Sequence, residues 1–475
     1  MLKKQSIKKN FFYQVVYQGL IYVIPLVLSP FLTRTLLEKS LGIYSYVNSI
    51  ASYFVILAML GIAKYGQRVV SQASDNSELL RKQFWSLYYL HGLISIVSLI
   101  AYCLFIKFFI REYRNIYIIE GIFVLSAFFD ITWLFYGLEN FRSVVIKNTI
   151  VKILELILCF ALVKKPNDLW IYTFINSGAI LLGQIIMIPQ AVRLVKPIYV
   201  SKSEVRNHIK PMLMLSVSVI AISLYTVFDK TLIGLITTKE NVAFYEYANK
   251  IINIPKTMLA TIGTVMFPRA CKLISDGNYE EHKIHFVNSV EITVILGIAS
   301  VFGLASIGNQ LAIVYYGNRF AECGRLIQVL SPLILILCLG DVLRTQYMIP
   351  KGMDRQYVFC TFLNAFINLT ISISLLFILP EDIKIYGAVI GTLVAETFGF
   401  LYQCYICKAI IQIKEIIKIT IPYLIIGISM SICVCYIGHV LSNDFLSLGI
   451  QVAVGIVIYG FLSILFVKKK RKIFN

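Results

Sequence analysis

Two stretches of the sequence, Tyr357–Leu379 and Leu446–Val467, each run for more than twenty residues without a charged side chain. A hydrocarbon core about 30 Å thick is crossed by about 20 apolar residues in an α-helix. Inside lipid, a helix is the only open segment that satisfies its own backbone. Of the 475 residues, 58% are hydrophobic and only 15% are charged, which leaves little for a soluble domain. We predict an all-α integral membrane protein.

The same search along the chain gives about fourteen transmembrane helices. The ends of the second, fifth and eighth are the least sharply set, because Lys64, Lys152 and Lys256 lie in or near them. The candidate spans are 11–35, 40–62, 84–106, 116–137, 143–163, 168–192, 211–236, 242–267, 287–315, 326–349, 357–379, 386–410, 416–438 and 446–467.

A short pattern in the second candidate helix returns in the eighth. Tyr44–Ile50 and Tyr245–Ile251 share two Tyr, an Asn and an Ile at the same places, and the same offset pairs Arg68 with Arg269. The pattern indicates a duplicated unit of six helices. Because six is even, both copies face the same way, and we expect a pseudo-two-fold axis along the membrane normal with the substrate path between the halves.

This duplication divides the chain into four parts. We expect an N-terminal six-helix lobe at 1–192, a cytoplasmic linker at 193–210 and a C-terminal six-helix lobe at 211–410. Helices 13 and 14, with a basic tail, occupy 411–475 and lie outside the duplication. They complete the lipid-facing surface or form a groove for an apolar tail.

Basic residues set the orientation, because short cytoplasmic loops retain Lys and Arg. They gather before the first span, in the linker and after the last span, which places both termini in the cytoplasm. The net charge of +19 is scattered over loops between apolar spans, so it favours topology and anionic lipid contact over nucleic acid binding.

Charged residues within spans survive only where they face protein or water. Several are three or four residues apart on one helix face, such as Lys152 with Glu155. These pairs are either structural ion pairs or functional groups, and we assign them no single role. The group also includes Asp341 with Arg344 and Glu246 with Lys250. Asp229, directly before Lys230, is a further candidate for gating or an ion pair. Lys256 has no close acidic neighbour on its own helix, so it needs a partner elsewhere, a water-filled cavity or an anionic substrate. Lys256, Arg34 and Lys230 are the candidates for binding a ligand phosphate.

Two other residue types suggest roles in a transport path. Pro25 and Pro30 remove backbone donors in the first helix, and a bend there either serves packing or gates a cavity. The repeated Tyr44 and Tyr245 open the second helix of each half. They either stack on sugar rings at a cavity mouth or anchor the helix at the membrane interface.

The sequence lacks a G-x-x-x-x-G-K-[ST] phosphate loop, an H-E-x-x-H motif and a G-x-S-x-G motif. We therefore expect no enzyme activity, no cofactor and no metal site.

Several motifs resemble those of bacterial polysaccharide flippases of the multidrug/oligosaccharidyl-lipid/polysaccharide exporter superfamily, over nearly the whole chain. Those in the first half are Pro25-Leu26, Pro30-Phe31-Leu32-Thr33-Arg34, Gly42-x-Tyr44, Leu60-Gly61-Ile62, Tyr65-Gly66 and Arg68. Those in the second half are Asp229-Lys230, Gly234, Tyr245-x-x-Ala248-x-Lys250-Ile251 and Phe267-Pro268.

The resemblance implies a flippase of the bacterial inner membrane for capsule or O-antigen assembly. Its substrate would be an undecaprenyl-pyrophosphate-linked oligosaccharide repeat unit, carried to the outer leaflet by alternating access. The implied partners are this substrate, membrane lipids, and a polysaccharide polymerase or other assembly proteins. Carried over by position, the basic sites are Arg34, Arg68, Lys230, Lys250 and Arg269.

Three other functions stay open at this point. A multidrug or cation antiporter of the same superfamily would share the fold, but should present an acidic cavity. A flippase for a peptidoglycan precursor lipid is closer in chemistry. A membrane scaffold without transport activity would be insensitive to neutralised charges.

Overall fold

The computed structural model describes residues 23–441 and 444–474. Over this part of the chain every regular element is a helix. Nine of the described helices, or ten if a bent pair forms one span, are long and apolar enough to cross a membrane. The prediction of an all-α, multi-pass membrane protein is confirmed. Residues 11–22 of the first predicted span, and the basic residues before them, lie outside the described residues.

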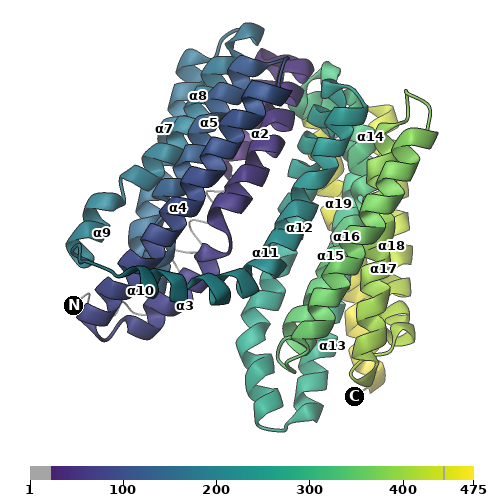
Figure 1. Ribbon diagram of the computed structural model, residues 1–475. Coiled ribbons are helices and arrows are strands. Elements are labelled where there is room, and N and C mark those ends of the chain that lie inside the picture. Colours follow the sequence, from purple (N-terminus) through teal and green to yellow (C-terminus); the bar gives the residue numbers. More distant parts are fainter. Residues whose placement is uncertain (1–22, 442–443, 475) are drawn as a thin grey trace. The chain divides into compact units, whose positions relative to one another are not determined.

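The chain forms two compact units, Met1–Gly234 and Leu235–Asn475. In unit 1, α2, α4, α5, α7 and α8 run side by side (Figure 1). The helices up to α11 are Val23–Thr35, α2 Leu37–Met59, α3 Ile62–Ala73, α4 Ser77–Phe109, α5 Arg114–Ser126, η1 Ala127–Phe129, α6 Thr132–Gly137, α7 Phe141–Leu162, η2 Pro166–Asp168, α8 Leu169–Ile185, α9 Ile188–Leu194, α10 Lys202–Asn207 and α11 Ile209–Ile236.

Unit 2 holds the remaining helices. Taken over both units, each of the fourteen predicted spans overlaps a helix or a run of consecutive helices. Those of unit 2 are α12 Lys239–Ser275, α13 Tyr279–Tyr316, η3 Asn318–Phe320, α14 Ala321–Leu330, α15 Pro332–Leu343, the π-helix η4 Arg344–Met348, α16 Asp354–Ile378, α17 Ile385–Ile406, η5 Cys407–Ala409, α18 Ile413–Val440 and α19 Phe445–Phe474.

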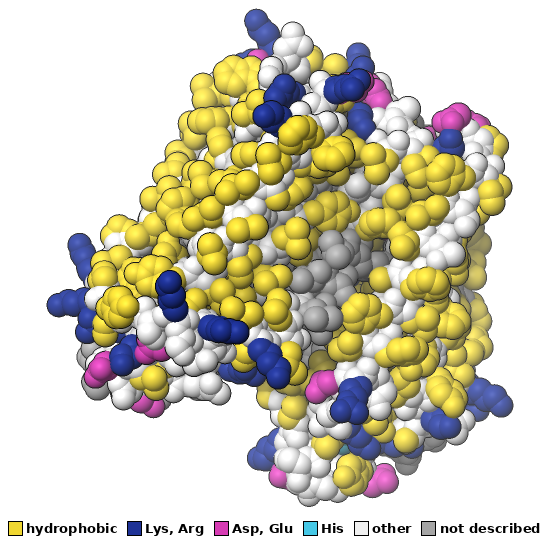
Figure 2. Space-filling view, in the orientation of Figure 1, with side chains coloured by type: hydrophobic (Ala, Val, Ile, Leu, Met, Phe, Trp, Pro, Cys, Tyr) yellow, Lys and Arg dark blue, Asp and Glu magenta, His cyan; other side chains and the backbone are white. Residues whose placement is uncertain are grey.

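Apolar side chains cover the helix midsections in both units, and Lys and Arg gather toward the helix ends (Figure 2). Large hydrophobic residues such as Phe366 and Ile432 are about two-thirds exposed, at 66% and 65%. Exposed apolar surface of this extent is unusual for a soluble protein but is what a lipid-facing surface needs.

The second predicted span is broken into α2 and α3 at Leu60–Gly61. Both residues have left-handed backbones, with φ of 30° and 73°. A Cβ atom at Gly61 would lie 2.9 Å from Ser216 Cα in α11. Glycine therefore permits both the turn and the close approach of α11.

The segment after α9 is fastened to α4 by side chains that bind its backbone. Arg81 Nε donates to Lys196 O at 3.0 Å, and Trp85 Nε1 donates to Val195 O at 3.0 Å. We call these contacts the linker clamp. Within unit 1, α11 also packs on α2, where Tyr53 donates to Thr231 Oγ1 at 2.9 Å. The units divide at Gly234, within the last turn of α11, whereas the predicted linker 193–210 lies before this helix. The predicted lobe boundaries stay predictions.

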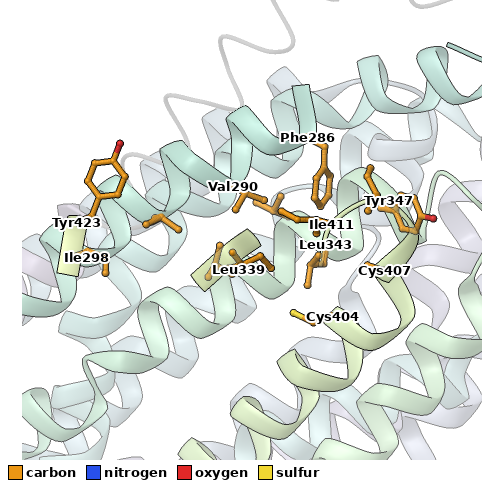
Figure 3. Close-up of a cluster of buried hydrophobic side chains, with 14 of the residues drawn as sticks. Phe286, Val290, Ile298, Leu339, Leu343, Tyr347, Cys404, Cys407, Ile411 and Tyr423 are labelled. Carbon is orange, nitrogen blue, oxygen red and sulfur yellow. The ribbon is translucent and has the colours of Figure 1, made fainter. Parts of the chain in front are cut away.

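The core of unit 2 gathers around α13 and α15. Phe286 and Val290 of α13 pack with Leu343 at the end of α15, Tyr347 of η4 and Ile411 (Figure 3). The sulfur atoms of Cys404 and Cys407 lie in the same cluster, where cysteine acts as a small hydrophobic residue.

Small residues four apart bring α16 and α17 into close contact. A Cβ atom at Gly387 would lie 2.9 Å from Leu376 N, and one at Gly391 would lie 3.0 Å from Ser372 N. Ala395 and Gly399 continue the series on α17. Small residues at this spacing let helix backbones pack closely in membranes, where no hydrophobic effect drives helices together.

Candidate functional site

Lys256 is the central cation of unit 2. It lies within α12, directly after Pro255, and its side chain is half-buried. Its ammonium group donates to Asn253 Oδ1 on the same helix at 3.3 Å. Among the described residues Lys256 forms no ion pair, as its sequence context predicts.

Helices α15 and η4 pack closely against α12. A Cβ atom at Gly263 of α12 would lie 2.7 Å from Asp341 Oδ2 and 2.7 Å from Thr345 Oγ1. Cys338 of α15 also donates its thiol hydrogen to the carbonyl of Lys256, at 3.6 Å between sulfur and oxygen. The absence of a side chain at position 263 therefore sets Asp341 against α12.

Asp341 and Arg344 form an ion pair, and the guanidinium carbon of Arg344 lies 5.4 Å from the Tyr357 ring centre. The pair lies where α15 becomes the π-helix η4, in a span that also bends by 43° around Ser331. Local π-helices in membrane helices often mark functional sites. Arg344 keeps 35% of its side chain exposed, so its guanidinium group stays accessible.

Glu396 of α17 completes this group. Asn364 donates to its carboxylate at 3.3 Å, and both Glu396 and Arg344 act electrostatically on Lys256. We call Lys256, Asp341, Arg344 and Glu396 the unit 2 charged cluster. It contains two cations and two carboxylates, so its charges balance. Binding of an anion here would depend on the ammonium group of Lys256, which no carboxylate contacts directly.

Unit 1 has a different polar network, which starts from the repeated tyrosine. Tyr44 of α2 donates to Asn176 Oδ1 of α8 at 2.9 Å, and its ring packs edge-on against Tyr172 at 4.7 Å. Asn176 donates in turn to Glu155 of α7 at 3.0 Å, and Glu155 pairs with Lys152 at 2.7 Å. Tyr44 thus contributes to contacts within the unit.

The other cations predicted for unit 1 are Arg34, Arg68 and Lys230. Arg34, at the end of the first described helix, and Arg68 of α3 are both exposed. The Arg68 guanidinium carbon lies 5.5 Å from the Tyr65 ring centre. Asp229 is buried and Lys230 is half-buried on α11.

The other predicted residues of unit 2 lie along the length of α12. Tyr245 is buried, and the Lys250 ammonium group lies 4.0 Å from the Tyr247 ring centre. Glu246 is half-buried in the same turns. Arg269 is exposed near the other end of α12 and pairs with Glu281 at 2.9 Å. Only Lys256, Asp341 and Arg344 among the predicted residues come together in the charged cluster.

The two prolines of the first described helix differ in exposure. Pro25 is exposed and Pro30 is half-buried, and the Pro30 carbonyl accepts a hydrogen bond from Thr33 at 3.1 Å. Their gating role stays a prediction.

Two buried polar residues, Glu120 and Asn364, were not predicted from the sequence. Glu120 stands near the start of its predicted span, where an acidic residue suggests an interface, yet its side chain is fully buried. Asn364 lies in a span without charge. Its spacing of four from Asn368, and of eight from Ser372, was the available signal of a buried polar face.

The model of a family described as "Polysaccharide biosynthesis protein" matches residues 7–274, more than half of the chain. The chain belongs to the polysaccharide biosynthesis protein family. Two relatives of this family member are each named "Putative O-antigen transporter". One, from Shigella dysenteriae, is 27% identical over 401 residues, which cover 83% of this chain and 98% of the relative. The other, from Escherichia coli K12, is 23% identical over 359 residues, covering 74% and 86%.

Solved structures agree with this family assignment at the level of fold. A lipid II flippase, MurJ, in an inward closed conformation superposes with a TM-score of 0.72 at 16% identity, covering 96% of this chain and 99% of that one. An inward-facing multidrug resistance MATE family transporter of the MOP superfamily gives 0.59 at 14% identity, covering 86% and 97%. The fold is therefore that of a two-lobed helical transporter. All four compared proteins are named as transporters or flippases, and this agrees with the expectation that the chain is not an enzyme.

Proposed function

We propose that the chain is a flippase for a lipid-linked oligosaccharide. It would carry an undecaprenyl-pyrophosphate-linked repeat unit from the cytoplasmic to the outer leaflet of the bacterial inner membrane, by alternating access. Both termini would be cytoplasmic. The observation that carries the proposal is the similarity to the protein named "Putative O-antigen transporter" along 98% of that relative's length.

The physical chemistry of such a substrate agrees with the charges in unit 2. A head group with two phosphates cannot cross hydrocarbon unaided, because an unpaired charge there costs at least about 2.5–3.5 kcal/mol. Lys256 is a cation of α12 within the predicted span 242–267, and its direct hydrogen bond goes to a neutral amide. A phosphate oxygen that approached Lys256 would gain a charge-assisted hydrogen bond without displacing a carboxylate.

The test is deletion of the gene in its own bacterium, followed by complementation. Deletion should remove the surface polysaccharide and leave lipid-linked repeat units on the cytoplasmic side. Wild-type protein and Lys283→Gln, which removes an exposed lysine of unit 2, should both restore export. Lys256→Gln should reduce export by about tenfold or more, because a hydrogen bond between charged groups contributes roughly 1.5–3 kcal/mol. Equal amounts of each variant in the membrane are the folding control.

Other outcomes separate the alternatives. Normal export by Lys256→Gln would show that this ammonium group does not contact the phosphate. Intact surface polysaccharide with accumulated peptidoglycan precursor would identify a precursor flippase. Unchanged glycans with altered drug tolerance would identify an antiporter.

A further inference from the structure

The feature that the proposed function leaves unused is a buried carboxyl group in unit 1. Glu120 lies on α5, within a membrane span, and its side chain has no exposed surface. Its two hydrogen-bond partners are both neutral. Asn48 of α2 donates to Oε1 at 3.4 Å, and Ser177 of α8 donates to Oε2 at 3.0 Å.

The second buried glutamate of unit 1 provides a contrast. Glu155 contacts the ammonium group of Lys152 at 2.7 Å, and this lysine is 38% exposed. Over the described chain Glu120 has no such cation. An ionised carboxylate held this way inside a membrane protein would be strongly destabilising, so the enclosed group is best accommodated with a proton bound.

The partners of Glu120 fit a proton better than a metal ion. Calcium and magnesium ions, the cations that prefer carboxylates, take several oxygen ligands. Here the two contacting groups present an N–H and an O–H to the carboxyl group. No group of three or more His, Cys, Asp or Glu side chains suited to a metal occurs in the described residues. Rotation of the Asn48 amide by half a turn would offer its oxygen to a protonated carboxyl group, so either protonation state keeps a hydrogen bond to α2.

Asn48 connects this carboxyl group to the repeated motif. Its counterpart in unit 2, Asn249, donates to Tyr245 O of its own helix at 3.0 Å. The duplicated asparagine thus contacts an acid in unit 1, whereas in unit 2 its hydrogen bond among the described residues goes to the backbone of its own helix. The halves have diverged, with a buried acid in unit 1 and the charged cluster in unit 2.

Other titratable groups lie around Glu120. Helices α2, α4 and α5 contribute tyrosine phenol groups. Helix α7 contributes a glutamate–lysine ion pair, whose glutamate accepts a hydrogen bond from Asn176 of α8. They are Tyr46, Tyr102, Tyr117, Glu155 and Lys152. Phenols are neutral near pH 7, and Glu155 is already paired, so Glu120 is the group whose charge changes most readily.

We propose that Glu120 is a proton-binding residue that loads and unloads one proton in each transport cycle. When water reaches the site from the outer side, a hydronium ion transfers its proton to the carboxylate and leaves a water molecule. When the site opens to the cytoplasm, the acid returns the proton to water and becomes a carboxylate. The hydrogen bond to Asn48 transmits the change to α2. Proton binding is a property of unit 1 alone, whereas its use in transport rests on the proposed function.

Infrared difference spectroscopy of the purified full chain in lipid nanodiscs tests proton binding directly. A pH increase should reduce a carbonyl-stretch band of protonated carboxyl groups. This band should be absent in Glu120→Gln and present in Glu155→Gln. Glu120→Asp, which keeps a titratable group, should move the band to a different frequency. This variant provides the same test if Glu120→Gln does not fold. A band unchanged by both Glu120 variants would overturn the proposal.

Export of surface polysaccharide then tests the coupling. In complemented cells, wild-type export should fall severalfold when an uncoupler collapses the proton gradient. Glu120→Gln should export at the low level with or without the uncoupler. Normal, uncoupler-sensitive export by Glu120→Gln would reject the coupling while leaving the infrared result to stand. A deletion strain that keeps its surface polysaccharide would instead refute the proposed function.

Discussion

His208 shows how one side chain fastens the segment between α9 and α11 to unit 1. It lies outside the membrane spans, directly after α10, and is buried. Tyr65 Oη lies 2.9 Å from Nδ1, and Ser86 Oγ lies 2.9 Å from Nε2. Because hydroxyl groups both donate and accept, a neutral imidazole satisfies both contacts. Burial lowers the pKa of His208 below its usual value.

The lowered pKa of His208 predicts a pH dependence of stability. The unfolded chain, with a histidine pKa of about 6.5, binds the proton more readily than the folded chain. The contribution of His208 is therefore complete above about pH 6.5 and is lost as pH falls through the lower, folded pKa. Thermal unfolding of the purified protein between pH 8 and pH 5 should show this loss. His208→Gln should flatten the dependence, whereas His439→Gln, at an exposed position, should leave it unchanged. Equal slopes for wild type and His208→Gln would contradict the assignment.

At the scale of elements, the helices follow from the sequence but their faces do not. In lipid, both the exposed and the buried side of a helix are apolar, so hydrophobicity does not separate them. On α7, Ile150 is 58% exposed while Val151 is 7% exposed. The sequence does not show the bends either: Leu60–Gly61 lies inside one apolar stretch, and the contact of Gly61 with Ser216 of α11 joins residues far apart in the chain. For the same reason the sequence found the pair Asp341 and Arg344 but did not reveal that Glu396 lies in the same cluster, or that Glu120 is buried.

The α16–α17 pair provides the element-scale prediction. Gly387→Val would place carbon atoms against the backbone of Leu375 and Leu376, and α17 would have to move away from α16. We expect a loss of about 1–3 kcal/mol, as for overpacked cores, seen as a lower melting temperature and less protein in the membrane. A Cβ atom at Gly449 on α19 would meet no atom within 4 Å, so Gly449→Val is the matched control. If both variants melt at the wild-type temperature, the close packing contributes little to stability.

For the whole molecule, the duplication and the charge distribution predict which turns face each side of the membrane. The turn between α12 and α13 should be cytoplasmic, and the one between α16 and α17 should face outward. Asp276 and Asp382 are exposed in these turns. In a background with the ten cysteines replaced, a membrane-impermeant maleimide should label Asp382→Cys in intact spheroplasts. Asp276→Cys should react only after permeabilisation. The reverse pattern would invert the predicted topology.

The linker clamp has a consequence for how this part of the chain can change over time. Arg81 and Trp85 bind carbonyl oxygens, which every amino acid possesses, at Val195, Lys196 and Pro197. Replacing a side chain at Lys196 therefore leaves the attachment intact, while replacing Arg81 or Trp85 removes it. Related chains should therefore retain the arginine and the tryptophan, while the residue types at positions 195–197 vary.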